Sequence, residues 1–553
     1  MSSEIEKLTE AYLERVKRPK TWSGIPVKEM YTPDDVKGLD YQRDLGNAGD
    51  YPFTRGIYPD MYRGRFWTTR EVCGFGTPAD TNKWLKFQMG EGVGGLNVIF
   101  DLPSETGVDS DHPLAAGDVG LGGVAMCSIK DMDEITEGIP LDKVSFSLIS
   151  ADPVTLAAYI AVAQNRGIDI STLMGTIQNE PLHSRYCAAD PSCYPLDLSY
   201  KLAIDIIEYC ARYVPRWVTG NVNLYNLRET GITAAQEIAF GFAFAIAHVD
   251  GALKRGLKID EFANRRAFYC SAHIDFFEEI AKLRAARRMW AKIMKEKYHA
   301  QDPKSWKFRF AVHTAGSSLV YQQPLNNIIR VAYEALAAVL AGAQSLHACS
   351  FDEPVALPTK ESQRIAVRTQ QILAYETGVG NVVDPLGGSY YVETLTNKIE
   401  EEATRILGEI ENMGGALEAI RTQWFDREID AASIRYQKEV EGGERIMVGV
   451  NAFTVPAEEE SPVGAHQIHP ESAQLQIDKV KNLKATRDQN KVRLALEQLR
   501  QDSGKGESFN LMPAIIEALK AYATRSEILG TIREVYGYPY DPLGVVKSPF
   551  STH

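Results

Sequence analysis

Polar side chains of the kinds that bind ligands follow several short apolar runs of this 553-residue chain. They are Thr176, Gln178, Tyr225, Asn226, His273, His313, Cys349 and Glu353. In a barrel of parallel strands, ligands and catalytic groups gather at the carboxyl ends of the strands. A single histidine is more often a hydrogen-bonded core residue, but polar residues at the ends of several strands predict one ligand site.

The sequence lacks the short motifs of several enzyme classes. It contains no H-E-x-x-H, no G-x-S-x-G and no P-loop, which disfavours a metalloprotease, a serine hydrolase and an NTPase. Its seven cysteines form no C-x-x-C pair, so neither a disulfide framework nor a zinc site is predicted.

A segment rich in arginine and aromatic residues spans residues 51–82. Arg55, Arg63, Arg65 and Arg70 lie among tyrosines, phenylalanines and a tryptophan. A solvated loop could have this composition, but arginine interleaved with aromatics also suits an adenine ring and phosphates. The segment therefore predicts a nucleotide-bearing ligand.

Eight short β-branched or apolar runs alternate with helical patterns along the middle of the chain. They span residues 96–101, 144–149, 172–177, 217–223, 266–272, 307–314, 345–351 and 379–385. Strands that alternate with helices predict parallel pairing, and eight such units predict an α/β fold of the (β/α)₈ TIM-barrel type. A large, doubly wound open sheet is the alternative.

Helices are predicted over residues 151–167, 234–256 and 275–298, where apolar residues recur every three or four positions. Asp152 and Thr233 are expected to cap two of them, and Gly167 and Gly256 to end them. The domains predicted are an N-terminal arm over 1–90, a barrel over 91–455, and a linker with a helical extension over 456–553. The extension is too poor in strands for a nucleotide-binding domain.

The net charge of the chain disfavours two classes of binding partner. Lys and Arg number 60 against 73 Asp and Glu, for a net charge of −13, which disfavours general binding to nucleic acid or to an anionic membrane. The charged N-terminus has no apolar signal core, and no apolar stretch approaches bilayer length. A cytoplasmic, soluble protein is expected.

The motifs, taken in order, resemble those of the methylmalonyl-CoA mutase family. The segments that carry the resemblance are 51–82, GDVGLGGVA, GTIQNE, KLRAAR, QSLH, DEPVALPT and DPLGGSYYVE. The resemblance covers nearly the whole chain. It implies an adenosylcobalamin-dependent isomerase that moves a CoA-thioester group to the neighbouring carbon by radical chemistry, in which the cofactor supplies the difficult step.

The resemblance also assigns the site residues. Those matched to the coenzyme A and acyl site are Tyr58, Met61, Thr68, Arg70, Val72, Thr176, Gln178, Ala188, Arg216 and Arg265. Gln178, Tyr225 and Asn226 match the catalytic positions, and His313, Cys349 and Glu353 match cofactor-binding positions.

The sequence lacks the motif with which this family ligates cobalt. The family ligates cobalt with the His of D-x-H-x-x-G, and no histidine here follows an Asp at that offset. The chain therefore resembles the large subunit of a split mutase, and we expect a separate small cobalamin-binding subunit. By resemblance, two large subunits pair with two small ones, and a G-protein chaperone is a further partner to consider.

The acyl pocket departs from the methylmalonyl enzymes. Their W-T-I-R-Q-Y reads WTTREV here, with Val72 at the Tyr position, and Ala188 stands where an Arg clamps the substrate carboxylate. Asn226 replaces a His, His313 a Gln and Cys349 an Asn. Methylmalonyl-CoA is therefore disfavoured, because Ala cannot hold the same anion.

A wider pocket with relocated polar groups suggests a bulky substrate. The new polar residues are His183, Arg185, Arg228, His273 and His313. We expect an arylsuccinyl-CoA to benzylmalonyl-CoA type of rearrangement, such as that of 2-(2-aminophenyl)succinyl-CoA. The alternatives are 2-hydroxyisobutyryl-CoA or isobutyryl-CoA mutation, and a catalytically inactive CoA-binding scaffold.

Overall fold

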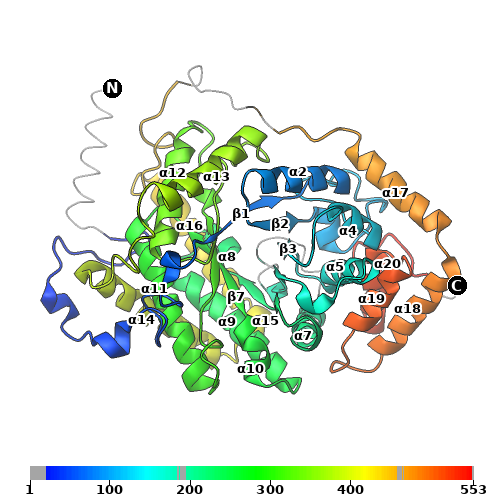
Figure 1. The fold of residues 1–553 in the computed structure, drawn as a ribbon, viewed down its shortest axis with the longest axis horizontal. Coiled ribbons are helices and arrows are strands. Elements are labelled where there is room, and N and C mark those ends of the chain that lie inside the picture. The colour runs from blue at the N-terminus through cyan, green and yellow to red at the C-terminus, as the bar shows by residue number, and fades with distance from the viewer. Residues whose placement is uncertain (1–19, 183–185, 187–194, 457–463, 465, 551–553) are drawn as a thin grey trace. The chain divides into compact units, whose positions relative to one another are not determined.

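The computed structural model describes residues 20–182, 186, 195–456, 464 and 466–550. Its strands are β1 (Thr68–Cys73), β2 (Gly95–Ile99), β3 (Ser145–Ile149), β4 (Gly175–Ile177), β5 (Trp217–Val218), β6 (Asn221–Asn223), β7 (Ala267–Ala272), β8 (Phe310–Thr314) and β9 (Ser345–His347). They follow the order β5-β4-β3-β2-β1-β9-β8-β7-β6 and pair in parallel. The predicted α/β barrel of the (β/α)₈ type is confirmed (Figure 1).

Seven of the eight predicted runs contain strands, and the run over 217–223 contains both β5 and β6. The prediction of a strand over 379–385 is wrong. Those residues form turns, because Gly378 and Asp384 have positive φ angles of 71° and 49° and Val382 is exposed. The prediction also missed β1, which we had included in the N-terminal arm.

The longer helices are α2 (Pro78–Gly90), α4 (Ile129–Ile135), α5 (Pro153–Asn165), α7 (Leu196–Tyr213), α9 (Ala234–Lys254), α11 (Phe276–Lys292), α12 (Asn326–Leu340), α13 (Lys360–Tyr375), α14 (Tyr390–Asn412), α16 (Trp424–Glu441), α17 (Ser472–Thr486), α18 (Gln489–Ser503), α19 (Met512–Lys520) and α20 (Arg525–Val535). Short helices are α3 (Leu102–Thr106), α8 (Tyr225–Glu229), α10 (Ile259–Phe262) and α15 (Ala416–Arg421). Single turns are η1 (Pro33–Val36), η2 (Tyr41–Leu45), η3 (Met61–Arg63), η4 (Ile170–Thr172), η5 (Ala263–Arg265), η6 (Ile293–Lys297) and η7 (Gly316–Ser318).

The predicted helix caps are present. The Asp152 side chain accepts hydrogen bonds from two backbone N–H groups at the start of α5. The Thr233 hydroxyl accepts one from Gln236 at the start of α9. Gly167 and Gly256, with φ angles of 71° and 91°, follow the ends of the same helices, where a left-handed residue is needed.

The chain divides into two compact units, each built from separate stretches. Unit 1 comprises Met1–Thr69, Asn223–Ala243 and Phe268–His466, and unit 2 comprises Arg70–Val222, Phe244–Ala267 and Gln467–His553. The predicted boundaries of the arm, barrel and extension, at residues 90 and 455, divide the chain into consecutive stretches. They stay a prediction.

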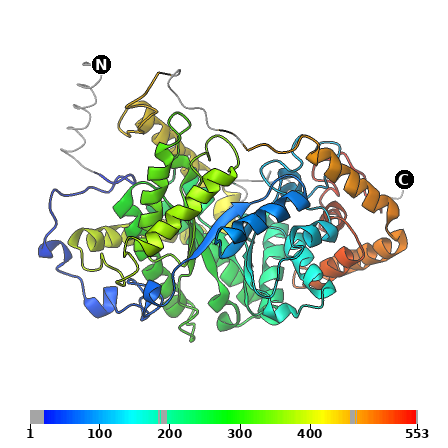
Figure 2. The ribbon, with the colours of Figure 1, turned by 45° about the horizontal axis from the view of Figure 1, so that its top comes forward.

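Unit 2 has an aromatic core behind its strands. Tyr159 of α5 lies with its ring centroid 5.4 Å from that of Phe146 and 5.3 Å from that of Trp217. The C-terminal helices α17–α20 belong to this unit, and α19 packs against α5 (Figure 2). The helical extension is therefore part of the core of unit 2.

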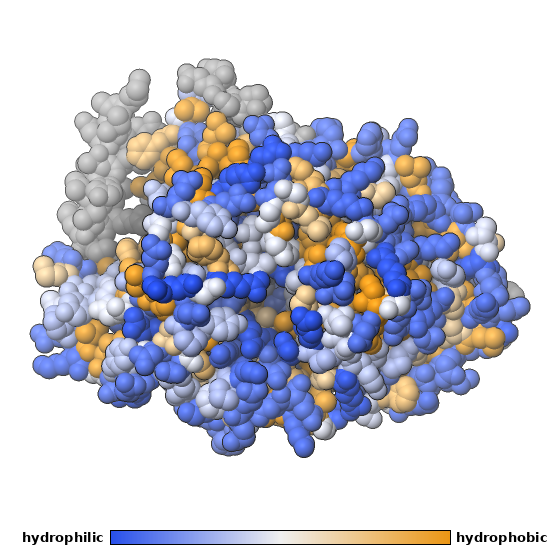
Figure 3. All heavy atoms as spheres, viewed as in Figure 1, coloured by the Kyte–Doolittle hydropathy of each residue, from blue (hydrophilic) through white to orange (hydrophobic). Residues whose placement is uncertain are grey.

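Unit 1 also has an aromatic core. Phe268 at the start of β7 lies with its ring centroid 4.9 Å from that of Trp290 on α11 and 4.4 Å from that of Phe308. On its surface, Leu325, which precedes α12, and Ile329 and Tyr333 of α12 are exposed, and hydrophobic residues gather in the upper left of Figure 3. No helix among the described residues is both long enough and apolar enough to span a bilayer.

Candidate functional site

One cluster of predicted site residues lies at the carboxyl ends of β8 and β9 in unit 1. His313 is the fourth residue of β8 and pairs in register with His347, the last residue of β9. Their ring centroids are 4.0 Å apart. The Cys349 Sγ atom lies 3.6 Å from His313 Nδ1. The parallel register of two strands therefore brings these three side chains together.

Tyr225 extends this cluster from α8, which directly follows β6. Its ring centroid lies 4.1 Å from that of His313. Asn226 lies next to it in sequence, and its backbone N–H donates to Asn223 Oδ1 at 3.0 Å. The structure thus brings predicted catalytic and cofactor-binding residues into one cluster.

Four groups at this site are neutral at neutral pH. Burial lowers the pKa of His313 and of His273 well below the usual value. Burial, with the nearby charge of Glu353 as a further cause, raises the pKa of the Cys349 thiol and of the Tyr225 phenol. These groups can donate and accept hydrogen bonds without a net charge on either histidine, the thiol or the phenol.

Glu229 is a group beside this cluster that titrates near neutral pH. Burial raises its pKa to about 7, although its Oε2 atom accepts a hydrogen bond of 2.6 Å from the Ser317 N–H. Ser317 also connects this carboxylate to His273, since the Ser317 Oγ lies 3.4 Å from His273 Nε2.

Unit 2 carries the other predicted catalytic and acyl-site residues. Thr176 lies on β4, opposite Ser147 of β3. Gln178 follows β4, is buried, and donates its backbone N–H to Leu148 O at 3.0 Å. Val72 lies on β1 opposite Asn97 and is half-buried. Ala188, His183 and Arg185 lie outside the described residues.

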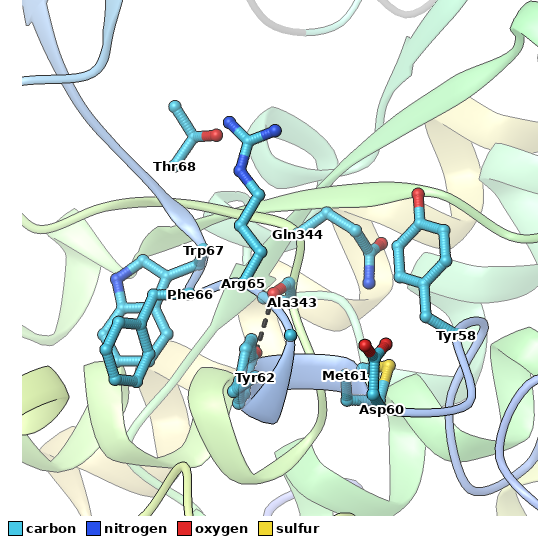
Figure 4. A pocket seen from close by; sticks show the side chains of 11 residues that line it. Tyr58, Asp60, Met61, Tyr62, Arg65, Phe66, Trp67, Thr68, Ala343 and Gln344 are labelled. Atoms are coloured by element: carbon cyan, nitrogen blue, oxygen red, sulfur yellow. Dashed lines mark hydrogen bonds between the residues drawn. The ribbon is translucent and has the colours of Figure 1, made fainter.

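A pocket of about 470 Å³ lies in unit 1 at the amino-terminal ends of β1 and β9 (Figure 4). Its lining residues are Tyr58, Asp60, Met61, Tyr62, Gly64, Arg65, Phe66, Trp67, Thr68, Ala343 and Gln344. Tyr58, Met61 and Thr68 are three of the residues predicted to bind coenzyme A. The volume is in the range of small-molecule sites.

Local packing fixes the shape of this pocket. Trp67 donates its indole N–H to Gln370 Oε1 at 3.1 Å, and Tyr62 donates its hydroxyl to Ala343 O at 2.6 Å. A Cβ at Gly56 would lie 2.8 Å from the sulfur of Met61, so the glycine leaves the space that Met61 fills. The aromatic wall and the buried methionine are therefore held in place without a ligand.

The sequence analysis did not predict Gln344 or Lys307 as site residues, and it named Arg65 only as a member of the arginine-rich segment. Gln344 and Arg65 line the pocket, with Arg65 and Thr68 on one side of Gln344 and Tyr58 on the other (Figure 4). The Lys307 Nζ atom lies 5.2 Å from the Tyr58 ring centroid. Arg65 could have been assigned from the arginine-rich segment, whereas nothing at Lys307 or Gln344 in the sequence pointed to this pocket.

The predicted coenzyme A arginines belong to unit 2, also at the amino-terminal ends of strands. Arg70 donates to Asn97 Oδ1 at 3.0 Å and to Ser145 Oγ at 2.7 Å. A Cβ at Gly95 would lie 2.6 Å from the Arg70 guanidinium carbon, so this glycine admits the side chain. Arg216 directly precedes β5, and Arg265 precedes β7 by two residues.

Comparison with known proteins shows what the chain is similar to. It is 41% identical over 526 residues to the 2-hydroxyisobutanoyl-CoA mutase large subunit of Aquincola tertiaricarbonis, covering 95% of this chain and 93% of that protein. It is 41% identical over 522 residues to the methylmalonyl-CoA mutase of Rhizobium meliloti, covering 94% of this chain and 72% of that protein.

The human mitochondrial methylmalonyl-CoA mutase is 38% identical over 520 residues, covering 94% of this chain and 68% of that protein. The family described as methylmalonyl-CoA mutase matches residues 20–538. These matches cover both units and both groups of site residues. The chain therefore belongs to the methylmalonyl-CoA mutase family, whose members are isomerases.

Proposed function

We propose that the chain is the large, substrate-binding subunit of an adenosylcobalamin-dependent acyl-CoA mutase that catalyses a 1,2-shift of the CoA-thioester group. The observation that carries this is the arrangement in unit 1, where the pocket with Tyr58, Met61 and Thr68 lies at the amino-terminal ends of strands. The cluster around His313 lies at the carboxyl ends.

This arrangement suits a long ligand that has a nucleotide at one end and a thioester at the other. A five-residue strand such as β8 spans about 17 Å. A flexible arm along the strand direction would therefore bring the acyl group near the carboxyl ends while the nucleotide stays near the pocket. From the family resemblance, we propose Arg70, Arg216 and Arg265 as partners for phosphate or pantetheine groups.

The proposed catalytic residues position the acyl group through hydrogen bonds. Gln178 and Asn226 carry amides that can donate to a thioester carbonyl, and neither can transfer a proton near neutral pH. The Tyr225 phenol is neutral and can donate as well, since its pKa is raised by burial. Their role is therefore orientation and the exclusion of water.

The described residues fit the adenosyl side of the cofactor, which when bound supplies the radical that starts the rearrangement. Cys349 and His313 lie side by side, and the exposed Glu353 carboxylate can accept hydrogen bonds from sugar hydroxyls. The sequence contains no D-x-H-x-x-G. We therefore propose a separate small subunit as the source of the cobalt ligand, in a complex of two large and two small subunits that a G-protein chaperone could maintain.

For the acyl group, we propose an arylsuccinyl-CoA that rearranges to a benzylmalonyl-CoA type product, such as 2-(2-aminophenyl)succinyl-CoA. Val72 and Ala188 are short where the methylmalonyl enzymes have long side chains. The rings of Tyr225, Tyr269, His313 and His347 lie together, with centroids 4.0–5.9 Å apart for the neighbouring pairs. An aromatic cluster suits a substrate that carries an aryl ring.

The second candidate is a short branched or hydroxylated acyl-CoA, such as 2-hydroxyisobutyryl-CoA or isobutyryl-CoA. It is favoured by the 41% identity to a 2-hydroxyisobutanoyl-CoA mutase large subunit over almost the full length of both chains. A third candidate, an inactive CoA-binding scaffold, is favoured only by the replaced residues at positions 226, 313 and 349.

The deciding experiment combines the chain with a cobalamin-binding small subunit and adenosylcobalamin, and assays arylsuccinyl-CoA, 2-hydroxyisobutyryl-CoA and methylmalonyl-CoA. We expect the highest kcat/KM with the arylsuccinyl-CoA. Turnover of only the short acyl-CoA, or comparable turnover of methylmalonyl-CoA, would show that the wide-pocket interpretation is wrong. Binding of acyl-CoA with no turnover of any substrate would favour the scaffold.

A further inference from the structure

Three soft metal-ligating side chains surround one point in unit 1. His313 Nδ1 or Nε2, His347 Nδ1 or Nε2 and Cys349 Sγ supply one ligand atom each, and these three atoms lie within 4.8 Å of one another. All three residues are buried. The sequence analysis predicted no metal site, because these residues form no short spacing motif.

The separations are close to those of a bound ion. Zn²⁺ holds sulfur at about 2.3 Å and nitrogen at about 2.0–2.1 Å, so tetrahedral ligand atoms lie about 3.5 Å apart. The three ligand atoms lie within 4.8 Å of one another, so they are already near this spacing. The widest separation must shorten by about 1 Å, which small rotations of the side chains can supply.

Two hydrogen bonds around the cluster are of the kind that orient metal ligands, and a third, from the Cys349 thiol to Thr314 O at 3.2 Å, is lost when the thiol ionises. A ring nitrogen 2.7 Å from the carbonyl oxygen of Thr314 must donate, so His313 carries its proton on Nδ1 and keeps a lone pair on Nε2. Ligating histidines commonly donate their other ring N–H to a backbone carbonyl in this way. The Cys349 backbone N–H donates to Thr314 Oγ1 at 2.8 Å, which holds the third ligand in place.

We propose that His313, His347 and Cys349 bind one Zn²⁺ ion, with the fourth coordination position left to a water or another ligand. Two imidazoles and a thiolate with an open position form a ligand set that zinc accepts. On binding, the S–H bond of Cys349 breaks, the Zn–S bond forms, and the proton passes to solvent. No oxidation or reduction takes place.

This inference goes beyond the proposed function and stands without it. It concerns the chain alone, with no cobalamin, small subunit or acyl-CoA present. Because we also assign His313 and Cys349 to the adenosyl side of the organic cofactor, zinc and that cofactor would exclude one another.

The test measures metal binding by the purified full chain after removal of metals with a chelator. Calorimetric titration with Zn²⁺ is expected to give one site per chain. Titration with Co²⁺, which takes the same ligands, is expected to give a thiolate-to-cobalt charge-transfer band in the near ultraviolet. The variants Cys349→Ser and His347→Asn should lose at least tenfold in Zn²⁺ affinity, and Cys349→Ser should also lose the band.

Two matched variants serve as controls. Cys270→Ser changes another buried cysteine of the same unit, and His299→Asn changes an exposed histidine. Both should keep the affinity and the band. An unliganded wild-type chain, or unchanged affinity and an unchanged band in Cys349→Ser, overturns the proposal. Thermal unfolding of each variant without metal separates loss of the site from loss of the fold.

Discussion

Arg70 is held in place by residues of β2 and β3. Two neutral side chains, Asn97 and Ser145, accept its hydrogen bonds, and Gly95 leaves space for its guanidinium. We expect Arg70→Ala to weaken coenzyme A binding by about 1.5–3 kcal/mol, as for a lost charge-assisted hydrogen bond. Calorimetric titration with free coenzyme A measures this.

The matched control for this prediction is Arg166→Ala. Arg166 belongs to the same unit and is partly exposed, and its guanidinium pairs with Asp133 at 2.7 Å. Its loss should leave the affinity for coenzyme A unchanged. Equal affinities in wild type, Arg70→Ala and the corresponding variants of Arg216 and Arg265 would remove the assignment of these arginines.

Val72 is expected to set the width of the acyl pocket. Its replacement by the Tyr of the methylmalonyl enzymes should lower kcat/KM for an arylsuccinyl-CoA by at least tenfold, because the ring would fill space that the substrate needs. The affinity for free coenzyme A should stay the same, since Val72 is assigned to the acyl end. An unchanged kcat/KM for the bulky substrate would contradict the wide pocket.

Glu229 is expected to make stability depend on pH. The unfolded carboxyl ionises near 4.5, whereas the folded one keeps its proton up to about pH 7 because it is buried. Between these values the folded state binds more protons, so the free energy of unfolding falls as pH rises. The total loss is about 3 kcal/mol.

In Glu229→Gln this contribution is absent, because the amide does not titrate. Urea unfolding of both proteins at about pH 4.5 and about pH 8, on either side of this window, should therefore show the variant gaining in stability relative to wild type as pH rises. A difference that is independent of pH, or that changes in the opposite direction, would show that this carboxyl does not have a raised pKa.

At the scale of elements, the sequence predicted the strands that are regular apolar runs, and it failed for one strand with charged residues and one partly apolar turn. Apolar runs between predicted helices correctly located most of the strands, because buried parallel strands consist almost entirely of apolar residues. β1 was missed because TTREVC places two charged residues, the buried Glu71 and Arg70, within the strand. The run over 379–385 is apolar in part, but its positive φ angles at Gly378 and Asp384 form turns.

Some residues of the candidate site could not be identified from the sequence. Resemblance supplied Tyr58, Met61 and Thr68, and the structure places them around one pocket. Gln344 and Lys307 are far from Tyr58, Met61 and Thr68 in sequence. They lie near these residues because the fold places the starts of β8 and β9 beside them. Spacing in sequence cannot reveal such neighbours.

The helical extension is expected to be fastened to unit 2 by one buried arginine. Arg525 at the start of α20 is fully buried and forms an ion pair with Asp152, the N-cap of α5. It also donates to Thr155 Oγ1 at 2.9 Å and to Met126 O at 2.9 Å. Arg525→Ala should lower the free energy of unfolding by about 3–5 kcal/mol, because Asp152 would keep a buried charge without its partner.

The comparison variant is Arg493→Ala on α18 of the same extension. Arg493 is exposed and pairs with Glu497 four residues on, so its loss should cost about 0.3–0.5 kcal/mol. Urea unfolding of both variants measures the difference. A loss below about 1 kcal/mol for Arg525→Ala would mean that the extension is held mainly by its apolar helix contacts.

At the scale of the whole molecule, the chain has a net charge of −13, yet the ligand we propose for it, coenzyme A, is also anionic. Net charge therefore excludes general polyanion binding but does not decide the affinity of a particular site. The placement of individual cations decides that affinity, and Arg70, Arg216 and Arg265 all lie at or near the amino-terminal ends of strands within one unit.

The last prediction concerns cobalamin. No histidine of the sequence has the D-x-H context of a lower cobalt ligand. We expect the isolated chain to elute from a sizing column without adenosylcobalamin and to show no turnover. With a small subunit that carries D-x-H-x-x-G, the complex should retain the cofactor and isomerise its acyl-CoA.

Arg70→Ala separates cofactor binding from substrate binding in that complex. The variant should retain cobalamin as wild type does, because the arginine is assigned to coenzyme A, and should lose affinity for the acyl-CoA alone. Stoichiometric retention of adenosylcobalamin with turnover by the isolated large chain would contradict the two-subunit proposal. Loss of cobalamin from the Arg70→Ala complex would instead show that this arginine supports the interface or the cofactor, because its effect would then not be confined to coenzyme A.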